Sequence, residues 1–397
     1  MLILADNSFR YIMQFKRFIN AFKRLETPFY FYDLDILDQT LRTYTKNLIK
    51  YGYKAHYAMK ANANPRILEI IQRSGLGADC VSGNEVQLAL DMGFDPETVV
   101  FAGVGKSDKE IRTALQGGIF SFNCESVPEI KIINDLAAQM GKTARISLRL
   151  NPNIDAHTNK HITTGRSRDK FGISEWMLDD VLQVFANSTN IKLIGLHFHI
   201  GSQVTDMRVF EMLCDKVNYF QRWFEQRDIR LEHINLGGGV AVNYKNPLEN
   251  LYSPFETYFE TINRTLELRK GQKVHFEPGR ALVAQCGFLI SRVLYVKVGK
   301  GKKFAILDAG MNDLIRPALY GARHAVCNFT SASEKTEVYD VVGPVCESAD
   351  RFGLSVRLPE TARGDMVAIC SAGAYGQVMS MRYNQRELAQ AYYSPDL

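Results

Sequence analysis

The sequence lacks the features that mark secreted, zinc-binding and membrane-spanning proteins. Its seven cysteines are an odd number, lie far apart and include no Cys-x-x-Cys pair. Neither a disulfide framework nor a zinc site is therefore expected, and a reducing, cytoplasmic setting is favoured. No apolar run reaches the length of a membrane span, and the apolar opening at residues 1–5 is too short for a signal peptide. We expect no bound metal and no membrane association.

An excess of charge of one sign is also missing. The 48 basic and 43 acidic residues give a net charge of +5, without a long run of either sign. This balance suits a local site for a small anionic molecule and does not support binding to nucleic acid. Between residues 9 and 25, phenylalanines recur at helical spacing among basic residues. We expect this helix to dock on its own protein rather than on a membrane.

Short apolar runs alternate with helix-like stretches over much of the chain. After an aromatic strand at 29–33, the expected strands are 56–60, 77–81, 99–104, 119–123, 145–151, 193–199, 233–236 and 274–277. Eight such alternations are typical of a parallel (β/α)8, or TIM-like, barrel. An open doubly wound sheet is the alternative, but no Gly-x-Gly-x-x-Gly opens the first helix.

The character of the sequence changes after residue 280, where β-rich runs are separated by turns and no regular helical alternation survives. At 397 residues the chain is long enough for two domains. We therefore predict an α/β fold with two parts. Residues 33–281 form the barrel, and residues 1–32 with 282–397 form a second, β-rich domain of sandwich or barrel-like form.

Lys60 ends an apolar strand at the expected mouth of the barrel. Burial there favours the neutral amine that Schiff-base chemistry needs. The alternative is a strand-end lysine that reaches solvent or pairs with Asp79 or Glu85.

Two further strand ends carry residues that could contact a ligand. His197 and His199 lie on one side of their strand, as a metal pair, a structural pair or an imidazole that lies flat on an aromatic cofactor. Gly237, Gly238 and Gly239 directly follow the next strand, where exposed backbone N–H groups suit a phosphate.

Glu277 and Arg280 end the eighth strand, the position at which barrels often hold phosphate. An internal ion pair between them is the alternative. Together with Lys60 and a flat imidazole, these residues meet the needs of pyridoxal 5'-phosphate, because a glutamate can keep the pyridine nitrogen protonated.

These motifs resemble the barrel-type, fold type III pyridoxal-phosphate-dependent decarboxylases, and most of all the branch of that family that acts on diaminopimelate. The matching segments are 57–62, 77–82, 197–203, Gly237-Gly238-Gly239, Glu277-Pro278-Gly279-Arg280, 308–313, 343–348 and Gly373-Ala374-Tyr375-Gly376. They occur in family order from about residue 27 to 384, so the resemblance covers nearly the whole chain.

The resemblance implies a role for each matching residue. Lys60 is the Schiff-base lysine, His199 stacks on the ring and Glu277 pairs with the pyridine nitrogen. The remaining cofactor contacts that it implies are Asp79, Ser202, Gly237, Gly238, Gly239, Gly279, Arg280 and Tyr375. The substrate contacts that it implies are Arg280, Arg316, Tyr320, Glu347 and Tyr375.

The resemblance also implies a homodimer with shared active sites, in which the partner subunit supplies the presumed proton donor Cys346 together with Glu347. Arg316 can fork onto the second carboxylate of the substrate, and Glu347 can take its amine. The alternatives are a surface ion pair for Arg316 and a buried, inert thiol for Cys346.

Two other segments are compared with the family. Residues 153–173 resemble its mobile specificity loop and carry the basic run Arg166-Ser167-Arg168-Asp169-Lys170. Near the C-terminus, Tyr383-Asn384-Gln385-Arg386-Glu387 departs from the family's Tyr-Asn-Ser-Arg-Pro, and the chain stops where a further strand and helix are expected.

The expected function is decarboxylation of meso-2,6-diaminopimelate to L-lysine, the last step of lysine synthesis. Two alternatives stay open: a barrel-type decarboxylase of ornithine, lysine, arginine or carboxynorspermidine, and a pyridoxal-phosphate-binding regulator without turnover.

Overall fold

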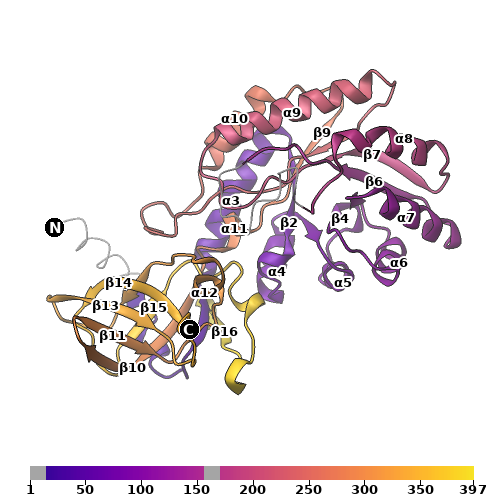
Figure 1. Cartoon of the computed structure of the whole chain (residues 1–397). Helices are drawn as coiled ribbons and strands as arrows, with labels where there is room; N and C mark the ends of the chain where they lie inside the picture. Colours follow the sequence, from indigo (N-terminus) through magenta and orange to yellow (C-terminus); the bar gives the residue numbers. More distant parts are fainter. Residues whose placement is uncertain (1–14, 156–169) are drawn as a thin grey trace. The chain divides into compact units, whose positions relative to one another are not determined.

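The computed structural model describes residues 15–155 and 170–397, and the chain divides into two compact units. The barrel unit contains residues 41–241 and 254–279. The sheet unit contains the residues up to Thr40, then 242–253 and 280–397. Each unit is built around a sheet of its own (Figure 1).

The barrel unit is a closed barrel of eight parallel strands, as predicted. These strands are β2 (Lys54–Ala58), β3 (Gly77–Cys80), β4 (Val99–Phe101), β5 (Ser121–Cys124), β6 (Ala144–Arg149), β7 (Ile191–His197), β8 (His233–Asn235) and β9 (Lys273–Phe276). Most of them end earlier than predicted, so that Lys60 and His199 lie just beyond β2 and β7.

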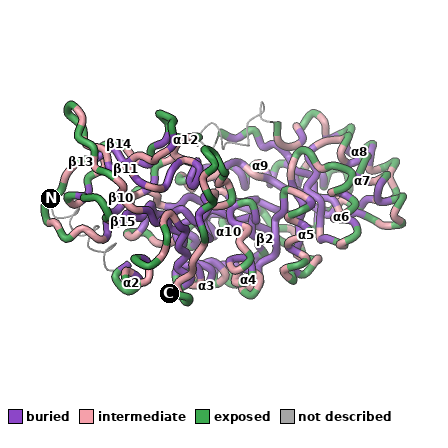
Figure 2. The backbone as a smooth tube through the Cα atoms, turned by 90° about the horizontal axis from the view of Figure 1, so that it is seen from below, coloured by how far each residue is buried: buried purple, intermediate pink, exposed green. Residues whose placement is uncertain are grey.

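Helices alternate with these strands, and capping side chains in the sequence mark where several of the helices begin. The helices are α3 (Leu34–Tyr51), α4 (Pro65–Arg73), α5 (Gly83–Asp91), α6 (Asp108–Gly117), α7 (Val127–Gln139), α8 (Leu178–Ala186), α9 (Arg208–Glu225) and α10 (Phe255–Thr265). The side chains of Asn64, Ser82, Ser107 and Ser126 cap the first turns of α4 to α7. Figure 2 shows buried backbone along the strands and exposed stretches on the outer helices.

The sheet unit contains eight strands, six of them in the order β12-β15-β10-β11-β13-β14. Its elements are α2 (Ile19–Phe22), β1 (Phe29–Tyr32), α11 (Arg280–Val283), β10 (Gly287–Gly299), β11 (Lys302–Leu307), α12 (Arg316–Tyr320), β12 (Val326–Asn328), β13 (Thr336–Val342), β14 (Arg351–Pro359), β15 (Met366–Ile369) and β16 (Gln390–Tyr393). Strand β1 pairs antiparallel with β10 and parallel with β16, so the last residues of the chain supply a strand.

The basic, phenylalanine-rich segment before β1 packs on its own protein, as predicted. Phe15, Phe18 and Phe22 are buried, and the ring of Phe15 lies 5.0 Å from that of Phe288 on β10. The described part contains only the short helix α2 rather than one long helix, and residues 9–14 of the prediction lie outside the described residues. In the part of the chain that is described, no helix combines the length and apolar character needed to cross a membrane.

Candidate active site

The predicted chemical residues of the barrel unit lie at the carboxyl ends of its strands. Lys60 is in the 3-10 turn η1 (Met59–Ala61) directly after β2, Asp79 is in β3, and Glu277 follows β9. Active sites of such barrels form at this mouth. The predicted burial of Lys60 is wrong, since the residue is exposed. Because β2 ends at Ala58, the lysine lies past the packed core.

Glu277 is a buried carboxylate held by three donors. Its Oε1 accepts from Nδ2 of Asn123 (3.0 Å) and Nδ2 of Asn235 (2.7 Å), and its Oε2 accepts from Nε2 of His197 (2.8 Å). Burial raises the pKa of the carboxyl, but the nearby imidazoles of His197, His199 and His56 outweigh that effect and hold the pKa below its usual range. An ionised carboxylate has about four acceptor positions, so one remains for a further donor.

The two asparagines that hold Glu277 were missed by the sequence analysis. Asn123 is the penultimate residue of β5, Asn235 ends β8, and both are buried. The available signal was a side-chain amide inside an otherwise apolar run, because a buried amide needs hydrogen-bonding partners.

Asp79 is a second buried carboxyl of the barrel interior, and its pKa is shifted in the opposite direction from that of Glu277. Burial, and next the negative charge of Glu277, raises its pKa well above the usual value. Its Oδ1 has no hydrogen-bond partner among residues 15–155 and 170–397. The barrel therefore keeps one carboxyl ionised and favours the protonated form of the other, which leaves a polar atom available to a ligand.

His199 contacts the glycine loop as a neutral imidazole. The N–H of Gly238 donates to its Nδ1 (3.3 Å), which assigns the ring proton to Nε2. Burial, followed by the charges of Lys60 and Arg149, lowers its pKa well below the usual value. A metal role for the two histidines gains no support, because no group of three metal-ligating side chains forms within the described ranges.

The glycine loop leaves no room for side chains. A Cβ on Gly237 would lie 2.3 Å from the carbonyl oxygen of Phe198, and one on Gly238 would lie 2.3 Å from that of Glu277. Gly237 and Gly239 also have φ angles of 68° and 121°, which favour glycine. The loop is tied to the preceding segment, which contains the half-buried Ser202, by a hydrogen bond from Val204 N–H to the Gly239 carbonyl (2.8 Å).

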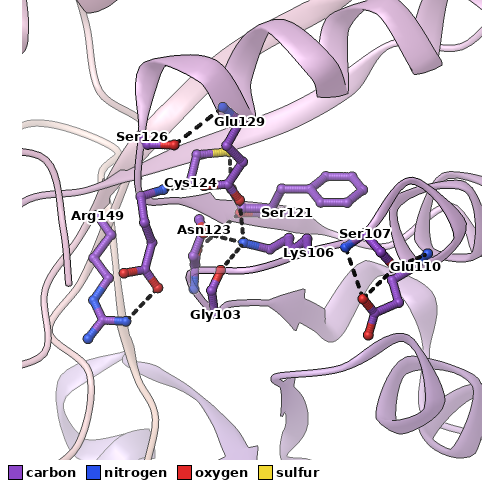
Figure 3. Close-up of polar contacts among 12 residues, drawn as sticks. Gly103, Lys106, Ser107, Glu110, Ser121, Asn123, Cys124, Ser126, Glu129 and Arg149 are labelled. Carbon is purple, nitrogen blue, oxygen red and sulfur yellow. Dashed lines mark hydrogen bonds and ion pairs between the residues drawn. The ribbon is translucent and has the colours of Figure 1, made fainter. Parts of the chain in front are cut away.

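The buried side chain of Lys106 holds the main-chain carbonyl of Asn123 (Figure 3). Nζ of Lys106 donates to the carbonyl oxygens of Gly103 (2.8 Å) and Asn123 (2.9 Å), and forms an ion pair of 2.5 Å with Glu129. The Lys106 side chain is only 1% exposed. The main chain of Asn123 is thus held by one buried charge while its amide holds another, Glu277. Sequence analysis did not predict this arrangement.

The last residues of the predicted specificity loop are fastened to the barrel by a second buried ion pair. Arg149 donates to Oε1 of Glu125 (2.7 Å), while Oε2 of Glu125 accepts from the N–H of Gly172 (3.1 Å). The guanidinium also lies over the ring of Phe171, 4.8 Å from its centre. Residues 156–169 of the predicted loop, with most of its basic run, lie outside the described residues.

In the sheet unit, two predicted arginines share one tyrosine. Arg280 donates to Oη of Tyr244 (2.7 Å), and the guanidinium carbon of Arg316 lies 4.7 Å from the centre of the same ring. Arg280 also lies over the ring of Tyr375, at 4.8 Å. Tyr375 has a φ of 56°, a strained value for a residue that is not glycine. Strain of this kind is often found at binding sites.

Arg316 is buried and has a neutral hydrogen-bond partner. The residue is 5% exposed, and its Nη1 lies 2.7 Å from Nε2 of His324. Within the described part of the chain it forms no ion pair with an acidic residue, so the surface-ion-pair alternative is wrong. Tyr320, at the other end of α12, is half-buried. A buried guanidinium without an anion nearby is costly, and an anionic ligand would relieve that cost.

Cys346 and Glu347 lie on an exposed turn of the sheet unit. The buried carboxylate of Asp350 shapes this turn by accepting from the N–H groups of Val345 and Met311, both at 2.7 Å. Oη of Tyr383 donates to Oε1 of Glu347 (2.7 Å). The alternative of a buried, inert thiol for Cys346 is therefore wrong.

The barrel unit fits the predicted cofactor on three observations. The glycine cradle would be filled by a single Cβ. Counting only partners from the described residues, Asp79 presents a buried oxygen without a partner, and the ionised Glu277 has one acceptor position left. A phosphate, a polar ring substituent and a protonated ring nitrogen are complementary to these features.

Comparisons with known proteins agree with these features. Residues 34–284 match the family model described as the pyridoxal binding domain of pyridoxal-dependent decarboxylases. The chain is 53% identical to the diaminopimelate decarboxylase of Bacteroides thetaiotaomicron, over 96% of this chain and 98% of that protein. A crystal structure of the Helicobacter pylori diaminopimelate decarboxylase complexed with L-lysine is 40% identical, covers 94% of each chain and has a TM-score of 0.88. The lysine/ornithine decarboxylase of Vibrio vulnificus has a TM-score of 0.82 over 97% of this chain and 98% of that chain, but at 22% identity it shows the fold alone.

Proposed function

We propose that this chain, which belongs to the pyridoxal-dependent decarboxylases and within them to the diaminopimelate decarboxylase family, converts meso-2,6-diaminopimelate to L-lysine and carbon dioxide. The observation that carries the choice of substrate is Arg316, a buried guanidinium whose hydrogen-bond partner is a neutral imidazole. Such a group calls for an anion, and the far end of diaminopimelate bears a carboxylate. A decarboxylase of ornithine would need an acidic group at this end of its substrate site instead.

The cofactor of the family is pyridoxal 5'-phosphate, which supplies an electron sink for the electron pair that carbon dioxide leaves behind. We assign Lys60 to its covalent attachment, and His199 and Asp79 to contacts with its ring. In the holoprotein the carboxylate of Glu277 would accept a hydrogen bond from the ring nitrogen and keep it protonated. The groups that we assign to the phosphate are Ser202, Gly237, Gly238, Gly239, Gly279, Arg280 and Tyr375.

The residues of the sheet unit act on the substrate in this proposal. Arg316 and Tyr320 bind the distal carboxylate and Glu347 binds the distal amine, while Arg280 and Tyr375 also contact the substrate. The exposed thiol of Cys346 returns a proton to the carbon that has lost carbon dioxide. Tyr383 supports the substrate contact of Glu347 by donating to its carboxylate.

We further propose a homodimer in which Cys346 and Glu347 complete the site of the partner subunit. Their exposure supports this, together with the exposed apolar residues Val378, Met381 and Leu388 on the neighbouring stretch of chain. Residues 33–281 form the cofactor-binding domain in this proposal, which the extent of the family match supports. All seven cysteines are free thiols, which supports a cytoplasmic location.

A carbon dioxide release assay tests the reaction directly. The purified holoprotein should release carbon dioxide from meso-2,6-diaminopimelate and not from lysine, ornithine or arginine. Faster release from ornithine or lysine would favour the rival decarboxylase, and no release from any of the four would favour a regulator.

Borohydride reduction followed by peptide mapping tests the cofactor assignment separately. We expect a pyridoxyl adduct on the peptide that contains Lys60. If a protein that has bound the cofactor gives no such adduct, the assignment of Lys60 is refuted, whatever the substrate is.

A further inference from the structure

We infer that His324 is a positioning residue that aims Arg316 at the distal carboxylate of the substrate without neutralising its charge. This inference rests on the proposed function, since it takes Arg316 to be the group that recognises that carboxylate. His324 belongs to none of the motifs that carry the family resemblance, and its relation to Arg316 is visible only in the folded sheet unit.

The hydrogen bonds of His324 determine its tautomer at both ends. Nδ1 lies 2.8 Å from the carbonyl oxygen of Cys370, which can only accept, so Nδ1 carries the proton. Nε2 then offers a lone pair. A guanidinium can only donate, and Nη1 of Arg316 donates to that lone pair at 2.7 Å. The two contacts require the same neutral tautomer.

The main chain directly after His324 is held in place by two hydrogen bonds. The next residue, Ala325, donates its N–H to the carbonyl of Tyr244 (3.1 Å) and accepts from the N–H of Cys370 (2.8 Å). The ring of Tyr244 packs edge-on against the His324 ring at 5.0 Å and 72°, and also lies against Arg316. Arg316 therefore has little freedom to turn away from its imidazole partner.

A neutral acceptor suits this position better than a carboxylate. An aspartate or glutamate could orient Arg316 equally well, but it would cancel the charge that attracts the substrate. The burial of His324, and next the charge of Arg316, lowers the pKa of the imidazole to about 3, so it stays neutral at physiological pH. Within the described ranges of the chain, one guanidinium N–H donor of Arg316 has an acceptor, which leaves a fork for a carboxylate.

Binding to the holoprotein, measured by calorimetric titration, tests this inference without turnover. The two ligands are L-lysine, which retains the distal carboxylate and amine of the substrate, and cadaverine, which is L-lysine without its carboxylate. The variants are His324→Phe, which removes the acceptor, and the isosteric pair His324→Gln and His324→Glu. Circular dichroism and cofactor absorbance report whether each variant folds and loads.

We expect wild type to prefer L-lysine to cadaverine. His324→Phe and His324→Glu should each weaken L-lysine binding about tenfold, and leave cadaverine binding unchanged, because a charge-assisted contact is lost or neutralised. His324→Gln should keep most of the preference, since an amide oxygen can replace Nε2 as acceptor.

Equal affinity of all variants for L-lysine would overturn the inference. If His324→Phe does not fold, the Gln and Glu variants decide, because they share a shape and differ in charge; matching affinities would again overturn it. A wild type that prefers L-lysine but releases no carbon dioxide from diaminopimelate would contradict the proposed function alone.

Discussion

Glu277 and His197 are joined by a hydrogen bond of 2.8 Å between two side chains that are almost completely buried inside the barrel. The pair is separated by 80 positions in sequence and meets because β7 and β9 both belong to one closed sheet. An ionised carboxylate in such a place is stable only with donors of this kind. Its charge is the feature that we expect catalysis to depend on.

Glu277→Gln removes that charge and keeps the shape of the side chain. We expect kcat for diaminopimelate to fall about a hundredfold or more, since proton-linked effects of positioned groups have this size, with KM little changed. Glu232→Gln is the matched control, because Glu232 lies at the surface and, among residues 15–155 and 170–397, forms an ion pair only with Lys192. Steady-state measurements of carbon dioxide release test this prediction. A Glu277→Gln enzyme of normal kcat would refute the proposed role of the Glu277 charge in catalysis.

Arg316→Ala should act on substrate binding. Loss of a desolvated charge pair costs about 2–5 kcal/mol, so KM for diaminopimelate should rise by at least about thirtyfold, while kcat changes less. Arg357→Ala, at an exposed position on β14, should leave KM unaltered. An unchanged KM in Arg316→Ala would point to another substrate.

The homodimer proposal predicts complementation between two inactive variants. Lys60→Ala and Cys346→Ala should each lack activity, because one loses the attachment point and the other the proton donor. Mixing equal amounts under conditions of subunit exchange should restore about a quarter of wild-type activity, since half of the dimers are hybrids and each hybrid has one intact site. Activity that stays at zero after proven exchange would argue that each subunit builds its site alone.

Lys106→Met should destabilise the barrel unit. The substitution leaves Glu129 as a buried charge without its ion-pair partner, which costs about 3–5 kcal/mol. Lys106→Met combined with Glu129→Gln should recover part of the lost stability, because the second substitution removes the unpaired buried charge of Glu129. Thermal unfolding of the three proteins measures this, and a double variant less stable than Lys106→Met would contradict it.

A row of three histidines, of which His56 and His275 are buried and His233 is half-buried, predicts acid sensitivity. Nε2 of His56 lies 2.8 Å from Nδ1 of His275, and Nε2 of His275 lies 2.9 Å from Nδ1 of His233. Burial lowers the pKa of each, and that of His233 falls to about 4. Between about pH 6.5 and 4 the unfolded chain therefore binds more protons than the folded one, and the stability present at higher pH is lost as the pH falls.

His233→Gln measures the share of one histidine in that loss. At about pH 5 a histidine whose protonation is suppressed costs about 2 kcal/mol relative to neutral pH. The thermal midpoint of wild type should therefore drop more between neutral pH and pH 5 than that of His233→Gln. Identical drops would mean that His233 takes no part in the acid sensitivity.

Much of the architecture was determined by the sequence alone, because strand and helix periods are local properties. The alternation of apolar runs predicted all eight barrel strands, and glycines with positive φ, such as Gly237 and Gly239, marked the cradle. The strand ends were placed less well, since nothing local distinguishes the last strand residue from the first residue of the following loop.

The tertiary structure alone decided the electrostatics. Asn123 meets Glu277 across 154 positions, His324 assumes its tautomer only against Cys370, and Lys60 is exposed rather than buried. Burial and charge depend on neighbours brought together by closure of the barrel and pairing of distant strands. The pKa of a side chain, and thus its chemistry, follows from those neighbours rather than from the adjacent sequence.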